Sequence, residues 1–216
     1  MAESTPPLRV VEETPAYWRV VFDYPPFNVM DGTMFQSLQD LLTRMDASQT
    51  LRVVVFESAI PDFYLAHFDL TGKLGNVMSG VGPTSLPVLL DTFVRLTKSP
   101  VVSIAKIRGC ARGASSEFVL ACDMRFASRE NTRLGQPEVA VGLHPGGGGA
   151  ERLPHLVGRG APSKSSSAAM ISTGIQPNVT VTSIAPSRMP NWTISSMRLH
   201  AESLLSTGAP SPRQRT

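Results

Sequence analysis

The chain contains little cysteine, few charged side chains and few aromatic ones. Its two cysteines, Cys110 and Cys122, exclude a disulfide-stabilised scaffold and favour a reducing, cytoplasmic location. No apolar run has the length of a membrane span, so we do not expect a transmembrane protein. The first residues are acidic and contain no apolar stretch. They therefore predict neither a secretory signal nor an Arg-rich transit peptide.

The sequence does contain enough apolar residues for a core. Of its 216 residues, 42% are hydrophobic and 17% are charged, which excludes a globally disordered chain. The net charge of +3 does not indicate nucleic-acid binding, because the excess is confined to the C-terminal quarter. Residues 1–160 carry 15 basic and 16 acidic residues, whereas residues 161–216 carry five basic and one acidic.

Residues 1–160 have the patterns of an α/β domain. Alternating or continuous apolar runs predict strands at residues 17–24, 52–57, 101–107 and 124–127. Helical spacing predicts helices at residues 31–45 (with Asp31 as N-cap), 85–97 and 114–121. Residues 63–70 are interpreted as a loop and residues 109–113 as a turn. The order of elements implies an α/β fold with a largely parallel sheet.

Residues 161–216 differ from the body in composition. Of these 56 residues, 18 are Ser or Thr and six are Pro, and neither a helical nor a strand period persists. We expect this segment to be poorly ordered or loosely packed. The predicted organisation is thus a core of residues 1–160 followed by a Ser/Thr/Pro-rich tail.

A Gly-rich turn and the start of a helix follow the predicted strand 101–107. Helix N-termini offer unpaired backbone N–H groups, and the small residues Gly113, Ala114 and Ser115 allow another group to approach closely. Glu117 lies in the first turn of this otherwise apolar helix. By itself, this segment favours a carboxylate that complements the helix dipole over a catalytic one.

A second segment, residues 134–153, contains Glu138 directly after Pro137 and four consecutive glycines, Gly146 to Gly149. Glu138 alone is typical of a surface acid beside a turn. The glycines fit a flexible loop, a tight crossing of two chain segments, or a phosphate cradle. Their spacing matches neither a Walker loop nor the dinucleotide-binding motif.

The remaining reactive residues give little support to other chemistries. His67 has no second ligand at metal spacing, so we expect no metal site and interpret it as a packed or solvent-facing loop histidine. Cys122 ends an apolar helix and is interpreted as a core thiol. Ser115 and Ser116 lack the G-x-S-x-G elbow of serine hydrolases.

Taken together, three ordered motifs resemble the crotonase (enoyl-CoA hydratase/isomerase) superfamily over about residues 8–159. The family's A-G-A-D-L segment is similar to residues 66–70, and its G-x-x-x-G-G-G-x-E-L-x-x-x-C-D segment to residues 109–123. Its G-x-P-E…G-G-x-x-R-L segment is similar to residues 135–153, and residues 25–29 match an earlier motif loosely. The resemblance implies a spiral of ββα units.

The resemblance also implies an enzyme that binds an acyl-CoA and uses no metal and no cofactor beyond the coenzyme A of its substrate. The backbone N–H groups of Phe68 and Ala114 would form an oxyanion hole for the thioester oxygen. Glu117 and Glu138 would be the acid/base residues that add water across the Cα=Cβ bond of an enoyl-CoA. The implied substrate-binding residues are Ala66, Asp69, Gly113 and Pro137.

Some positions depart from the family pattern. His67 and Phe68 replace small residues, and we expect Phe68 to narrow the acyl pocket. Gly113, Ala114 and Ser115 replace three glycines, and the role of Arg112 beside them is open. Two alternatives to a hydratase remain: a non-catalytic acyl-CoA-binding protein, or another reaction of the superfamily such as isomerisation or thioester hydrolysis. The resemblance implies a homotrimer or dimer of trimers, without a nucleic-acid or membrane partner.

The family pattern ends at Arg159, where the composition also changes. Back-translation of the tail with GC-rich codons, read two nucleotides later, gives an acidic text with helical spacing that is similar to the family. We therefore hypothesise that the tail results from a frameshift, which would remove helices that complete the CoA pocket and the trimer. The hypothesis would be contradicted if no single shift of the reading frame in the source gene gives a family-like sequence.

Overall fold

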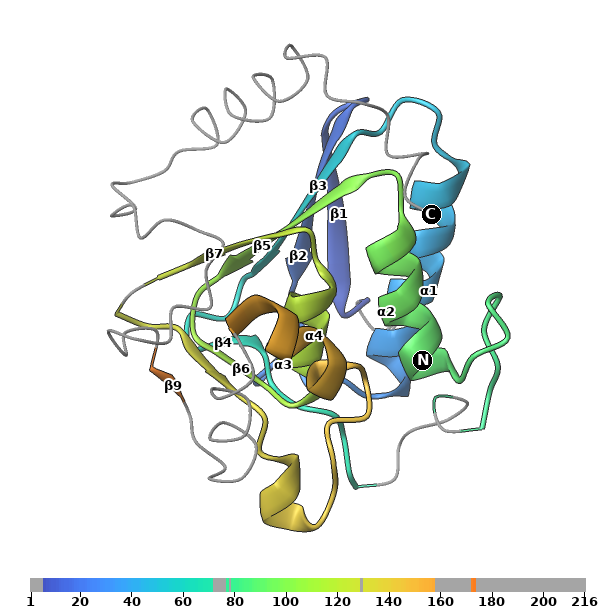
Figure 1. Cartoon of the computed structure of the whole chain (residues 1–216). Coiled ribbons are helices and arrows are strands. Elements are labelled where there is room, and N and C mark those ends of the chain that lie inside the picture. The colour runs from blue at the N-terminus through green and yellow to red at the C-terminus, as the bar shows by residue number, and fades with distance from the viewer. Residues whose placement is uncertain (1–5, 72–76, 78, 129, 158–171, 174–216) are drawn as a thin grey trace, which may run out of the picture. The chain divides into compact units, whose positions relative to one another are not determined.

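The computed structural model describes residues 6–71, 77, 79–128, 130–157 and 172–173. All of them belong to the compact body Met1–Ile184, and a second body, Ala185–Thr216, lies outside the described residues. The prediction for the tail 161–216 therefore falls outside the described residues, apart from residues 172–173. The described part consists of two β-sheets with helices packed against them (Figure 1).

The larger sheet has five strands in the order β1-β2-β3-β5-β7. Strand β1 is antiparallel to β2, and the other neighbours are parallel, which confirms the largely parallel pairing. Its strands are β1 (Leu8–Thr14), β2 (Tyr17–Phe22), β3 (Val53–Ser58), β5 (Val102–Ile107) and β7 (Met124–Ala127). The sequence pattern did not predict β1 because it is an edge strand in which Leu8 alone is buried.

The smaller sheet has the strand order β4-β6-β8-β9. Its strands are β4 (Phe63–Leu65), β6 (Cys110–Arg112), β8 (Arg133–Gly135) and β9 (Ser172–Thr173). The first three are mutually parallel, and β9 is antiparallel to β8. The loop expected at residues 63–70 and the turn expected at 109–113 are therefore wrong where β4 and β6 lie. Strands of three residues are too short to show a period of two.

Four α-helices and a short 3₁₀-helix complete the described part. They are α1 (Gly32–Ala47), α2 (Val88–Lys98), α3 (Ala114–Ala121), the 3₁₀-helix Glu138–Val141 and α4 (Gly149–Val157). Asp31 caps α1 as predicted, because its side chain accepts a hydrogen bond from the N–H of Met34 at 2.9 Å. Helices α1 and α2 lie side by side (Figure 1). No helix within the described ranges is long and apolar enough to cross a membrane.

Helix α3 lies inside the core, and all eight of its residues are buried. Its Phe118 ring packs 5.0 Å from Phe56, 5.7 Å from Phe22 and 6.3 Å from Phe93, measured between ring centroids. Such aromatic pairs each contribute about 0.5–1.5 kcal/mol beyond the area they bury. The cluster joins the larger sheet to α2 and α3 and fixes the position of α3.

Three ββα units follow one another along the chain: β3-β4-α2, β5-β6-α3 and β7-β8-α4. In each, the first strand belongs to the larger sheet and the second strand to the smaller one. This is the spiral of ββα units that the resemblance implies. Because β4, β6 and β8 are parallel neighbours, their carboxyl ends meet at one edge of the smaller sheet.

Candidate active site

The predicted site residues follow the carboxyl ends of the three parallel strands in the smaller sheet. Phe68 comes three residues after β4, Ala114 two residues after β6, and Glu138 three residues after β8. Hydrogen bonds from Arg112 N to Ala66 O at 3.2 Å and from Gly113 N to Gly135 O at 2.9 Å keep these ends together. Ligands of parallel α/β sheets bind at such an edge.

The backbone around Phe68 is held by Met30. The N–H of Met30 donates to His67 O at 2.9 Å, and the N–H of Asp69 donates to Met30 O at 3.1 Å. In this parallel bridge the N–H of Phe68 points away from Met30. Ala114 opens α3, where an N–H has no intrahelical acceptor. Among the described residues, neither N–H has a hydrogen-bond acceptor, so both are available to a ligand.

The carboxylate of Glu117 is bound by the glycine run. Only 2% of Glu117 is exposed, and its Oε1 accepts hydrogen bonds from the N–H groups of Gly147 and Gly149, each at 2.8 Å. A Cβ on Gly147 would collide with Glu117 Oε2 and would lie 2.7 Å from Cε2 of Phe93. The glycine run is therefore neither a flexible loop nor a phosphate cradle. It is the tight crossing of two chain segments, because it packs against α3 at Glu117. The anion it holds is a carboxylate of the chain itself.

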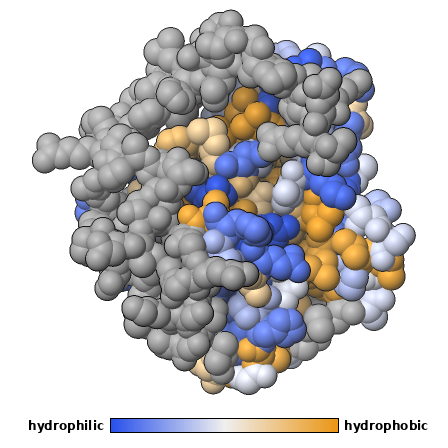
Figure 2. Space-filling model, in the orientation of Figure 1, coloured by the Kyte–Doolittle hydropathy of each residue, from blue (hydrophilic) through white to orange (hydrophobic). Residues whose placement is uncertain are grey.

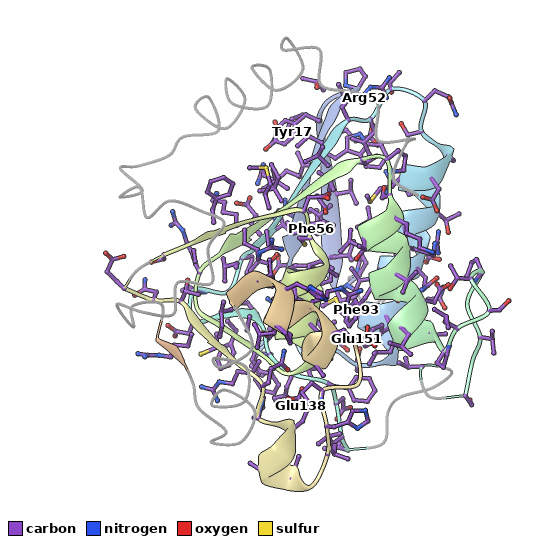
Figure 3. The ribbon with its side chains drawn as sticks, in the orientation of Figure 1. Tyr17, Arg52, Phe56, Phe93, Glu138 and Glu151 are labelled. Atoms are coloured by element: carbon purple, nitrogen blue, oxygen red, sulfur yellow. The ribbon has the colours of Figure 1, made fainter. Side chains whose placement is uncertain are left out.

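Glu138 is the first residue of the 3₁₀-helix, and its side chain lies near the N-terminus of α3 (Figure 3). A Cβ on Gly113, whose φ is 58°, would be 3.0 Å from Glu138 Oε1, so this carboxylate is close to the residue that precedes Ala114. With its amide nitrogen turned toward Glu138, the buried Gln136 donates to both carboxylate oxygens at 3.1 Å. Glu138 is half-buried and contacts Gln136, so it is more enclosed than a fully exposed acid beside a turn.

Burial raises the pKa values of both carboxyl groups. For Glu117, the N–H groups of Gly149 and Gly147 and the charge of Arg152 oppose this effect, whereas the charge of Glu138 adds to it. For Glu138, its own backbone N–H and the charge of His144 oppose the effect of burial. Two coupled carboxyl groups with raised pKa values can hold and exchange a proton closer to neutral pH than ordinary glutamates do.

The other predicted binding residues surround this centre. Ala66 is buried, and its N–H donates to Asn28 O at 3.0 Å. The Asp69 carboxylate accepts hydrogen bonds from the N–H and hydroxyl of Thr71, at 2.8 and 2.6 Å. Cδ of Pro137 would lie 4.0 Å from a Cβ on Gly113. Ala66 and Pro137 thus lie close to the strand ends that carry Phe68 and Glu138.

Three further predictions concern residues beside the centre. His67 is exposed, with Nδ1 2.8 Å from the carbonyl oxygen of Phe68, which confirms a loop histidine. Cys122 is a buried core thiol, and burial raises its pKa far above the ordinary value. Nη2 of Arg112 donates to Sγ of Cys110 at 3.7 Å. Within the described residues, no three His, Cys, Asp or Glu side chains could hold a metal ion.

Sequence reasoning missed the role of Asn28, which is fully buried. Its side-chain Nδ2 donates to Ser58 Oγ at 2.9 Å and to the backbone oxygen of Tyr64 at 3.0 Å. Its backbone carbonyl oxygen accepts a hydrogen bond from the N–H of Ala66. Asn28 thereby fixes the exit of β4, which leads to Phe68. The available signal was an isolated amide in the loosely matched motif of residues 25–29.

Four large hydrophobic residues of the described part are exposed to solvent. The four most exposed large hydrophobic residues in the described part are Leu70, Val81, Val141 and Leu143. Leu70 lies two residues after Phe68, and two others lie within five residues of Glu138. Figure 2 shows hydrophilic side chains over α4 and hydrophobic ones beside α2. Exposed apolar side chains thus occur in the segments that carry Phe68 and Glu138.

The ββα spiral, with two carboxylates and two backbone donors at its strand ends, defines a protein of the crotonase type. The family model described as enoyl-CoA hydratase/isomerase matches residues 15–178, and the chain belongs to this family. The match continues past Arg159, so the family pattern does not end where the motifs alone had placed its end.

Among curated relatives, the fatty acid oxidation complex subunit alpha of Aliivibrio fischeri is 32% identical over 134 residues, which are 61% of this chain and 19% of that protein. Human mitochondrial methylglutaconyl-CoA hydratase is 29% identical over 133 residues, 61% of this chain and 38% of that protein. The chain thus spans less than half the length of these two relatives.

Solved structures share the fold. A Streptomyces avermitilis protein described as a candidate enoyl-CoA hydratase is 30% identical, with a TM-score of 0.75 over 99% of this chain and 82% of its own. An enoyl-CoA hydratase from Bacillus anthracis, 24% identical, has a TM-score of 0.74 over 93% of this chain and 77% of its own.

Proposed function

We propose that this chain is an enoyl-CoA hydratase, which adds water across the Cα=Cβ bond of an enoyl-CoA thioester. The observation that carries the proposal is the convergence of Glu117 and Glu138 on the N-terminus of α3, with both pKa values raised. Coenzyme A would be part of the substrate, and the chemistry requires no further cofactor.

The N–H groups of Phe68 and Ala114 would bind the thioester oxygen. As water adds to Cβ, negative charge develops on this oxygen because the electrons of the double bond move toward the carbonyl. Fixed dipoles stabilise that charge without reorganising during the reaction. The helix dipole of α3 would add to the effect at Ala114.

The two glutamates would manage the protons. An ionised carboxylate accepts a proton from the attacking water, whose oxygen bonds to Cβ, and a protonated carboxyl donates its proton to Cα. Proton exchange with solvent restores the starting state. Because Oε1 of Glu117 already accepts two backbone hydrogen bonds, Oε2 is the oxygen that takes part in proton transfer. A pair of acid/base groups is what favours hydration over a reaction that moves a single proton.

The test is the substitution Glu138→Gln, which keeps the side-chain volume and removes the acid/base group. We expect kcat for the hydration of a four-carbon 2-enoyl-CoA to fall by on the order of 100-fold or more, with little change in acyl-CoA affinity. The matched control is Glu130→Gln, a change of the same kind at an exposed residue that contacts Ser128.

The products and the affinity separate the alternatives. Turnover that is equal in Glu138→Gln and in the parent chain contradicts the role of Glu138. A product with a shifted double bond would identify an isomerase, and free coenzyme A a thioester hydrolase. A parent chain that binds the thioester without converting it would be a non-catalytic acyl-CoA-binding protein. The homotrimeric assembly stays a prediction, which sedimentation velocity of the same sample would check.

A further inference from the structure

Arg152 contacts the same glycine run that binds Glu117, but from the other side. From α4, its Nη1 donates to the carbonyl oxygen of Gly147 at 2.9 Å. The N–H of Gly147 donates to Glu117 Oε1 at 2.8 Å. A single glycine is therefore bound at its N–H by a carboxylate and at its carbonyl by a guanidinium. The two charged groups are joined through one residue.

The contact between Arg152 and the glycine run is close. A Cβ on Gly148, whose φ is 100°, would collide with Nη1 of Arg152, so a larger residue there would be strained and would displace the guanidinium. The second nitrogen, Nη2, lies 3.4 Å from Thr97 Oγ1 on α2, a weaker contact at the surface. The guanidinium is half-buried, and its hydrogen bond to the carbonyl of Gly147 is shorter than its contact with Thr97.

Several groups from different elements act on the charge of Glu117. The 3₁₀-helix contributes the carboxylate of Glu138, which repels a charge on Glu117, and α2 contributes the apolar ring of Phe93. The glycine run contributes two N–H dipoles. Arg152, from α4, supplies the attracting cation, while His144 acts on Glu138.

We propose that Arg152 is a positioning residue for Glu117. By binding the carbonyl of Gly147, it holds in place the two N–H groups that bind Oε1 of Glu117, and its charge acts on Glu117 in the direction opposite to that of Glu138. The inference rests on the proposed role of Glu117, but it concerns the ligand-free protein. The tests of this inference therefore need no measurement of catalytic activity.

The first test is a titration of the full chain with ¹³C-labelled glutamate carboxyl groups, followed by NMR. The Glu117 signal is assigned as the one that disappears in Glu117→Gln. In Arg152→Met, loss of the cation disfavours the ionised carboxylate, so the midpoint of Glu117 should move to higher pH. In Arg152→Lys, which retains the charge, the shift should be smaller.

The second test is amide hydrogen exchange at Gly147. Both substitutions remove the guanidinium that fixes this residue, so exchange should accelerate roughly fivefold, which corresponds to about 1 kcal/mol for one net hydrogen bond. The control is Arg95→Met, because Arg95 is equally cationic and largely buried but pairs with Asp46 at 2.8 Å. It should change neither the midpoint nor the exchange rate.

Each outcome decides the question. An unchanged or lowered midpoint in Arg152→Met, or an equal shift in Arg95→Met, overturns the proposal. Should Arg152→Met not fold, Arg152→Lys carries the test: faster exchange at Gly147 supports the proposal, and unchanged exchange overturns it. A shifted midpoint in a chain that hydrates no enoyl-CoA would support the role of Arg152 while removing the hydratase function.

Discussion

Ser115 carries a buried hydroxyl group that has no hydrogen-bond partner among the residues the structure describes, so its removal should stabilise the protein. The residue is completely buried, and its Oγ has no hydrogen-bond partner in the described part of the chain. It lies three residues before Phe118 on the same face of α3, toward the phenylalanine cluster. A polar group left unsatisfied in such surroundings costs about 1–3 kcal/mol.

Ser115→Ala removes this cost and leaves Cβ and the packing around it unchanged. We expect the free energy of unfolding to rise by about 1–3 kcal/mol. For a chain of this length, each kcal/mol corresponds to roughly 2–4 °C in Tm. Urea unfolding followed by far-UV circular dichroism measures the change. The matched control is Ser116→Ala, the same substitution at the neighbouring residue, which retains 6% exposure.

The control separates burial from helix propensity. Ser116→Ala gains only the few tenths of a kcal/mol by which alanine exceeds serine in helices. If Ser115→Ala is no more stable than Ser116→Ala, the Ser115 hydroxyl is satisfied in solution. The argument from its missing partner would then be refuted.

Two further substitutions test the site. Burial and the charge of Glu138 raise the pKa of Glu117, so its ionised form destabilises the fold; this cost is absent below the ordinary value of about 4.3 and grows as pH rises through the folded value. Glu117→Gln should therefore raise Tm increasingly with pH in thermal melts. Phe68→Ala keeps the backbone donor but removes a ring 5.9 Å from that of Phe35. Relative kcat/KM for longer acyl chains should rise by roughly tenfold or more.

The opposite outcomes are equally clear. A Tm difference for Glu117→Gln that is independent of pH would show that the carboxyl group titrates normally. An unchanged chain-length profile for Phe68→Ala would show that its ring does not border the acyl group. Phe27→Ala, which removes a ring packed 5.9 Å from Phe63, is the matched control for the second experiment.

The sequence predicts β2, β3, β5 and β7 of the larger sheet well because their buried residues form apolar runs or alternate along the strand, and it predicts α3 well because all eight of its residues are buried. The segments that form β3 and β5 each contain at least four apolar residues. Helix α3 has the predicted bounds, Ala114–Ala121. The smaller sheet escapes prediction because β4, β6 and β8 have three residues each. Such strands are defined by their partners rather than by their own pattern.

The candidate site shows the same limit of local reasoning. From its own segment, Glu117 was interpreted as a carboxylate that complements a helix dipole. Its actual partners, Gly147 and Gly149, lie 30 and 32 residues further along the chain. No local pattern connects these residues. The resemblance to a family placed Glu117 and Glu138 together, whereas the contacts of Arg152 and Asn28 required the structure.

The residues of the candidate site come from three successive ββα units, and each unit supplies a different part of the site. The residue that follows β4 offers one backbone donor, the residues that follow β6 offer another donor and one carboxylate, and the segment after β8 offers the second carboxylate. These contributions depend on one another, because Glu117, which follows β6, is bound by Gly147 and Gly149 from the segment after β8. A change at Glu117 therefore also affects the glycine run after β8, although the two segments lie about thirty residues apart in the sequence.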